Sequence, residues 1–271
     1  MTPLARLGRA ATYAGLILAS FISVFPFFWM VVGATNTSAE LLKGKTSPGG
    51  ALWTNIANFW AFADMPRILF NSFFIAAVGT LLTLLVSSLA GYAFEIFRSR
   101  FRERLFALLL LMLSVPFAAL MIPLFIMMAN FKLINTYQAI ILPGVASIFI
   151  IFYFRQATKA FPHELRDAAR IDGLKEWQIF LHVYMPVMRS TYAAATIIVF
   201  MANWNNYLWP LIVLQTNDMK TITLTVATLI SAYTPDWGVV MVGATVATLP
   251  TLVIFFLLQR RFVEGMLGAV K

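Results

Sequence analysis

The sequence offers few side chains of the types that perform covalent or metal-dependent chemistry. It contains no cysteine and only two histidines, His163 and His182, which excludes thiolate chemistry and leaves little material for a metal centre. No serine–histidine–aspartate set, paired carboxylates or His-Glu-x-x-His pattern lies near an apolar segment. Gly44-Lys45-Thr46 is similar to the end of a phosphate-binding loop, but Ala39 stands where that loop needs glycine. We therefore expect a chain that is not an enzyme and binds no metal or nucleotide cofactor.

A cluster of amide and aromatic side chains lies inside an apolar segment of the C-terminal half. Amides are costly in hydrocarbon unless they are paired, so these side chains should face a neighbouring helix or a wet pathway. Amides beside aromatic rings would suit the hydroxyls and the apolar faces of a sugar. Helix packing and contact with a solute both stay open at this point. The candidate pathway residues are Asn203, Asn205, Asn206 and Tyr207, and Trp204 and Trp209 belong to the same cluster.

The segment 161–186 has the pattern of two short helices joined by a tight turn. Pro162 suits the first position of a helix, and Gly173 suits a left-handed cap at its end. Small residues at the middle of one helix face would let another surface approach the backbone closely, which favours a docking element. An amphipathic helix lying on a membrane is the alternative. The expected face consists of Leu165, Ala168, Ala169 and Asp172.

Apolar composition determines which elements must position these residues. The 271 residues are 61% hydrophobic and 11% charged, with a mean hydropathy of +0.82, so lipid must be part of the solvent. Crossing ~30 Å of hydrocarbon takes roughly 20 apolar helical residues. The first apolar segment is longer than a signal peptide requires, and we interpret it as an uncleaved anchor. The six predicted spans are Tyr13 to Ala34, Phe70 to Phe94, Leu105 to Met128, Leu133 to Phe154, Thr191 to Gln215 and Trp237 to Leu258.

The charges predict the orientation of these spans. Of the 20 Lys and Arg residues, fifteen fall in the segments that would be inside if the N-terminus is inside, so both termini should be cytoplasmic. The net charge of +9 therefore indicates membrane topology rather than nucleic-acid binding. The predicted spans contain no Asp, Glu, Lys, Arg or His, which disfavours the alternative of an ion-coupled secondary transporter. We expect a partly ordered outer cap over residues 35–69 and a polar outer loop over 217–236.

The loop residues resemble the signature of ABC importer permeases, written Glu-Ala-Ala, three residues, Gly, nine residues, Ile-x-Leu-Pro. Asp replaces Glu, Val replaces Ile and Met replaces Leu, all conservative changes. The resemblance implies a coupling helix seated on a cytoplasmic ATPase, within an inner loop at 156–190. The coupling residues that it and the helix pattern indicate are Glu164, Asp167, Ala168, Ala169, Asp172, Gly173, Val183, Met185 and Pro186.

The resemblance covers nearly the whole chain and is nearest to the smaller permease subunit of maltose-type carbohydrate importers. Further similar segments are Asn71-Ser72, 204–210 and the tail 259–271. The resemblance implies the all-α fold of type I importer permeases, with an N-terminal part at 1–69 and a core permease domain at 70–271. It also implies a location in the inner membrane of a bacterium. The implied partners are a second, different permease, two copies of an ABC ATPase that bind ATP and Mg, and an outer solute-binding protein.

Overall fold

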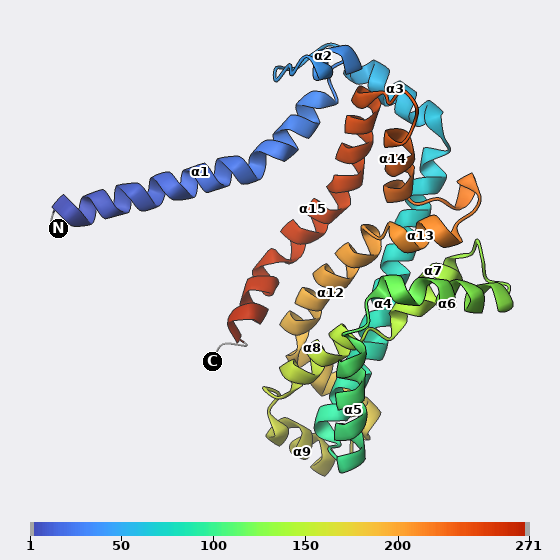
Figure 1. The fold of residues 1–271 in the computed structure, drawn as a ribbon. Coiled ribbons are helices and arrows are strands. Elements are labelled where there is room, and N and C mark those ends of the chain that lie inside the picture. The colour runs from blue at the N-terminus through green and yellow to red at the C-terminus, as the bar shows by residue number, and fades with distance from the viewer. Residues whose placement is uncertain (1–2, 269–271) are drawn as a thin grey trace. The chain divides into compact units, whose positions relative to one another are not determined.

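The computed structural model describes residues 3–268, and the part of the chain that it describes is built of helices. Figure 1 shows them as a succession of long and broken helices. They are α1 (Pro3–Gly33), α2 (Ser38–Leu42), α3 (Leu52–Phe62), α4 (Met65–Ile96), α5 (Arg100–Met112), α6 (Phe117–Asn130), α7 (Tyr137–Val145), α8 (Ile148–Thr158), α9 (His163–Ile171), α10 (Glu176–Ile179), the π-helix η1 (Phe180–Tyr184), α11 (Met185–Val187), α12 (Arg189–Trp204), α13 (Leu208–Val213), the 3₁₀-helix η2 (Asn217–Met219), α14 (Ile222–Ile230) and α15 (Trp237–Gly268).

The helices form two compact units. One comprises Met1–Met65 and Thr225–Leu249, and the other comprises Pro66–Leu224 and Pro250–Lys271. The first unit thus groups 225–249 with the N-terminal segment. The division expected from the sequence, at residues 69 and 70, stays a prediction. Both candidate sites of the sequence, the loop and the amide cluster, lie in the second unit.

Three of the six predicted spans are continuous helices. Residues Ala11–Gly33, Met65–Ile96 and Trp237–Gln259 are each long and apolar enough to cross a membrane. The other three predicted spans are interrupted, at 113–116, 146–147 and 205–207. The bend is 102° between α5 and α6 and 40° between α7 and α8. The fifth span is interrupted between α12 and α13, and a further bend of 82° at Met188 precedes this span. The described residues thus contain three spans, or up to six if each bent pair is one span.

Each break has a local cause in the sequence. Pro116 stands at the N-cap of α6 with extended backbone, and its ring prevents α5 from continuing. Ser147 caps α8 by accepting a hydrogen bond from Ile150 N, so a new helix begins at Ile148, two residues after Ala146. Asn205 ends α12, and its Nδ2 donates to Met201 O at 2.9 Å. Pro116, Ser147 and Asn205 thus lie at helix ends, whereas Pro123, Pro143 and Pro250 lie inside helices.

The core of the second unit joins α4, α6, α7 and α13 around one buried tryptophan. Trp209 is 1% exposed, and its indole Nε1 donates to Ala139 O at 2.8 Å. Ile75, Met128, Val213 and their buried neighbours surround it. Trp209 is therefore a packing residue, as the helix-packing interpretation of the amide cluster expected.

The outer segment after α1 is ordered by short-range polar contacts, in agreement with the predicted cap. Thr37 and Glu40 form a reciprocal capping box at the start of α2. The hydrogen bond from Lys45 and those from Thr37 lower the pKa of Glu40 to about 2. Asn55 Nδ2 donates to Ala34 O and Asn36 O, which ties α3 to the end of α1.

The segment 217–236 is not the plain polar loop that the sequence suggested. It contains α14, whose Ile222 and Leu224 are buried. Asn71 Nδ2 donates to Asp218 O and Lys220 O, and Ser72 Oγ accepts from Ile222 N. The prediction failed because it weighed the polar residues at both ends of the segment above the apolar run between them.

Candidate functional site

The loop 161–186 has the helix–turn–helix structure that its sequence predicted. Pro162 precedes α9 at the N-cap, one position earlier than expected, and Glu164 lies in the first turn near the positive end of the helix dipole. Gly173 follows the helix with φ +83°, so it is the left-handed residue that ends α9. The turn then leads directly into α10.

The exposed face of α9 differs from the predicted one. Ala168 is exposed, whereas its neighbour Ala169 is only 7% exposed and packs into the chain. Ile171 is 87% exposed, which is unusual for a large apolar side chain in a polar loop. Of the four residues of the expected face, Leu165, Ala168 and Asp172 are exposed and only Ala169 is buried, because successive helix positions are about 100° apart. Glu164, Leu165, Asp167, Asp172 and Gly173 are also exposed.

The last signature residues build the support of the loop rather than its outer face. Val183 and Met185 are half-buried and pack against the buried aromatic side chains of Tyr92, Phe161, Phe180 and Tyr184. Pro186 is exposed. Val183 lies in the π-helix η1, and Met185 and Pro186 follow it; π-helical turns are often found at functional sites.

One carboxylate, Glu176, holds the two halves of the loop together. Arg166 Nη2 donates to Glu176 Oε1 at 2.8 Å, and the Arg170 guanidinium reaches the same oxygen at 2.7–2.8 Å. Tyr92 Oη on α4 donates to Glu176 Oε2 at 3.2 Å. Displacement of α9 is therefore linked through Glu176 to the C-terminal end of α4.

A second set of charges joins α4, α5 and α8. Arg155 and Glu95 have side chains only 8% and 3% exposed, and Arg155 Nε lies 3.4 Å from Glu95 Oε2. Arg155 also donates to Glu103 Oε1 at 2.6 Å and stacks over the ring of Phe106 at 4.0 Å. Loss of one partner from a buried pair costs about 3–5 kcal/mol, because the other charge is left uncompensated. This set fixes the helix ends beside the loop.

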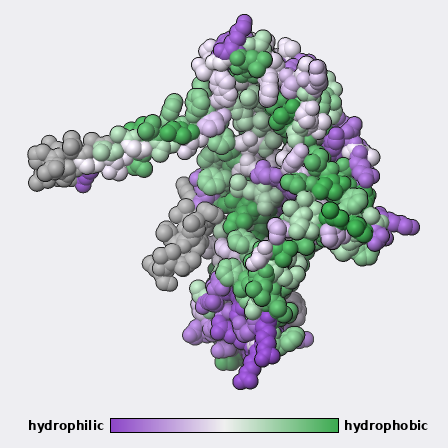
Figure 2. Space-filling model, in the orientation of Figure 1, coloured by the Kyte–Doolittle hydropathy of each residue, from purple (hydrophilic) through white to green (hydrophobic). Residues whose placement is uncertain are grey.

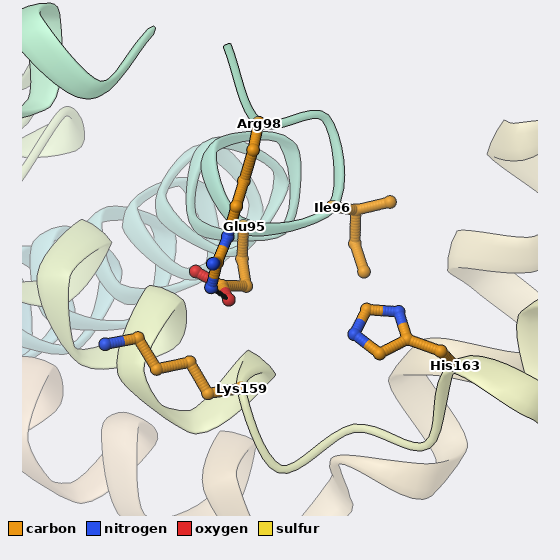
Figure 3. Close-up of a pocket in the computed structure, with 5 residues that line it drawn as sticks. All are labelled: Glu95, Ile96, Arg98, Lys159 and His163. Atoms are coloured by element: carbon orange, nitrogen blue, oxygen red, sulfur yellow. Dashed lines mark hydrogen bonds and ion pairs between the residues drawn. The ribbon is translucent and has the colours of Figure 1, made fainter. Parts of the chain in front are cut away.

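A cavity of about 500 Å³ adjoins this set of charges. It is lined by Glu95, Ile96, Arg98, Lys159 and His163 (Figure 3). Arg98 forms an ion pair with Glu95, and the His163 ring lies opposite Ile96. No cluster of three or more His, Cys, Asp or Glu side chains that could hold a metal occurs among the described residues.

Hydrophilic and hydrophobic residues lie on different parts of the surface of the second unit. Figure 2 shows hydrophilic residues over the end of the second unit that carries α9 and the start of α5. Large hydrophobic residues are exposed further along the same unit, including Phe117, Ile122 and Ile126 of α6. Such apolar surface on a chain with long apolar helices fits contact with lipid or with another membrane subunit.

The structure separates the four candidate pathway residues. Asn203 is half-buried and its Nδ2 donates to Thr80 Oγ1 of α4 at 3.4 Å. Asn205 is exposed and uses its amide within its own helix, and Tyr207 is exposed on the same break. Asn206 is half-buried and lines a cavity together with Asn203. The break between α12 and α13 thus brings only two of the four into one recess.

Several residues that organise the site were not singled out by sequence reasoning. They are Tyr92, Glu95, Arg155 and Glu176. The positions of Glu95 and Arg155 in the sequence could have indicated their pairing. Each residue comes directly after a predicted span, and a single charge next to hydrocarbon calls for a partner.

Broken apolar helices with a polar amphipathic loop define a multi-pass membrane protein of the permease class. Residues 84–268 match the family of the binding-protein-dependent transport system inner membrane component. The chain belongs to this family, and it is a permease subunit of an ABC importer. Permeases of this class work with a partner permease, an ATPase and a solute-binding protein, and ATP hydrolysis belongs to the ATPase.

Individual relatives cover nearly the full length of the chain. It is 64% identical over 266 residues to the lactose transport system permease protein LacG of Rhizobium radiobacter, which covers 98% of this chain and 97% of the relative. It is 33% identical to the arabinooligosaccharides transport system permease protein AraQ of Bacillus subtilis, over 97% and 96% of the two chains. The sn-glycerol-3-phosphate transport system permease protein UgpE of Escherichia coli is 32% identical, over 94% and 95%.

The fold also matches a solved structure. A chain of a bacterial ABC transporter involved in the import of the acidic polysaccharide alginate superposes with a TM-score of 0.85 at 17% identity, covering 97% of this chain and 99% of that one. This likeness confirms the all-helical type I importer permease fold. The alternative of an ion-coupled secondary transporter gains no support from these comparisons. Within the tail, residues 269–271 lie outside the described residues.

Proposed function

We propose that this chain is the smaller permease subunit of a sugar importer in the cytoplasmic membrane of a bacterium, with both termini on the cytoplasmic side. The observation that carries the sugar assignment is the 64% identity to a lactose permease over almost the whole chain. In this proposal the partner permease is a different chain, two ATPase subunits bind ATP and Mg, and an outer binding protein delivers the solute.

The loop 161–186 would pass the movement of the ATPase to the spans. Its outward side offers a small residue, Ala168, beside the exposed apolar side chain of Ile171. An ATPase groove can approach the backbone at the alanine and cover the isoleucine. On the other side, Glu176 connects α9 to Tyr92 of α4. A push on α9 would therefore reach α4 and shift the populations of the outward- and inward-facing states.

The test is to add bulk at the exposed alanine. Ala168→Trp should leave folding intact, because the side chain is exposed, but it should abolish association with the ATPase and ATP-dependent sugar uptake. Ala119→Trp places the same bulk on an exposed residue of α6, away from the loop, and should retain the ATPase. Wild-type ATPase association and uptake in the Ala168→Trp complex would refute docking at this face.

A further inference from the structure

A second cavity lies in the membrane-spanning part of the second unit, between α4, the α7–α8 break and the end of α12. Its volume is about 250 Å³. Its polar side chains are Thr83, Ser147, Asn203 and Asn206. Apolar residues complete the wall, among them Phe149, which is exposed. The cavity therefore presents hydroxyls, amides and an aromatic ring at a depth where hydrocarbon would otherwise surround the chain.

The broken helix gives this wall additional polar groups. α7 ends at Val145, and Ala146 leaves helical geometry with φ −94° and ψ 63°. Thr83 Oγ1 donates to Gly144 O at 3.3 Å, so one freed carbonyl is satisfied by α4. Non-helical backbone at membrane depth is tolerated where it is buried in protein or lines a cavity that holds water or solute. The position of the break beside the cavity fits the second case.

The two amides that line the cavity differ in what they bind. The hydrogen bond to Thr80 holds the Asn203 side chain against Gly79. A Cβ atom added at Gly79 would lie only 3.0 Å from Asn203 Nδ2. Asn206 makes no side-chain hydrogen bond among the described residues, although it is half-buried. A half-buried amide in a membrane protein calls for a partner. Asn206 is thus available to bind a molecule in the cavity.

The cavity wall carries no ionisable side chain. A phosphate or carboxylate in a recess of low dielectric needs a paired cation or several directed donors, whereas hydroxyl groups are matched by amides and hydroxyls. We propose that this cavity is the place where the chain touches the transported solute, and that it takes one ring of a neutral, hydroxyl-rich solute and not an anionic one. This inference rests on the proposed function as a sugar permease.

The size of the cavity indicates a partial site. Complete pockets for ligands of drug size occupy roughly 300–1,000 Å³. At about 250 Å³ the cavity holds part of an oligosaccharide, and the rest would lie against another surface, such as the partner permease. Phe149 can then cover the apolar face of the ring while Asn206 binds its hydroxyls.

Cysteine labelling tests the inference directly, since the chain has no cysteine of its own. Ala202→Cys, at a residue that lines the cavity, and Asn205→Cys are made in the complete importer with its binding protein, and both are treated with a thiol reagent that does not cross membranes. The best imported sugar from a panel of neutral mono- and oligosaccharides should slow labelling at 202, because a ring bound in the cavity blocks the reagent. It should leave labelling at 205 unchanged, and sn-glycerol 3-phosphate should protect neither position.

Uptake provides the second readout. Asn206→Ala should lower sugar uptake about tenfold while ATPase association stays at the wild-type level, and Asn205→Ala should transport normally. Wild-type uptake by Asn206→Ala, absence of protection at 202, or protection by the anionic probe would each overturn the inference while leaving the proposed function intact. Absence of ATP-dependent uptake of any neutral sugar by the wild-type complex would instead refute the proposed function, and with it this inference.

Discussion

Replacement of Glu176 should separate the binding of the ATPase from the movement of the spans. Glu176→Ala removes the acceptor that three side chains share, Arg166, Arg170 and Tyr92. The aromatic packing below the loop does not involve this carboxylate and should persist. The variant complex should therefore still bind its ATPase, while the loop loses its polar connection to α4.

The size of the effect follows from the exposure of each contact. The Arg166 side chain is 12% exposed, so its ion pair lies near the upper end of the range for exposed pairs, about 1 kcal/mol. The Arg170 side chain is 50% exposed, and we take about 0.3 kcal/mol for its pair. The hydrogen bond from Tyr92 to a charged, one-third exposed acceptor contributes about 1 kcal/mol. Together these give about 2 kcal/mol, or about a 30-fold increase in the released form of the loop.

The assay uses the complete importer in proteoliposomes. The ratio of ATP hydrolysed to sugar imported should rise in Glu176→Ala, and amide hydrogen exchange in 163–179 should accelerate about 30-fold if the loop opens independently. Glu164→Ala is the matched control, because this exposed glutamate has no hydrogen-bond or ion-pair partner among the described residues. Unchanged exchange and an unchanged ratio in Glu176→Ala would refute the role assigned to this carboxylate.

Two further predictions concern charges elsewhere in the chain. Arg155→Met should destabilise the protein by about 3 kcal/mol, because Glu95 stays buried with only Arg98 beside it. Thermal unfolding in detergent measures this loss. The control Arg100→Met changes an exposed residue and should have little effect on stability. The capping box at Glu40 should stabilise the folded chain above pH 4.5, and this stabilisation should disappear as the pH falls toward 2, because folding lowers the pKa of Glu40 from 4.5 to about 2. An NMR titration of the Glu40 carboxyl group measures this pKa, and a value near 4.5 would contradict the prediction.

The sequence predicted local features of the coupling loop well, since they depend on a few adjacent residues. Gly173 has the left-handed φ that its position after an amphipathic stretch predicted. The same reasoning did not determine the direction of Ala169, because a helix face is inward or outward only relative to the elements packed against it. It also missed Tyr92 and Glu176, which are 84 residues apart in the chain and meet only in the folded protein.

Composition and periodicity by themselves determined that this is an all-helical membrane protein, because apolar runs of sufficient length have no other stable environment than lipid. The loop signature determined the class of transporter. Only the tertiary structure decided that three spans are broken, that Asn206 and not Asn205 lines a cavity, and that Arg155 meets Glu95. These outcomes depend on which distant segments share one volume, and the packing of side chains from different helices sets that arrangement.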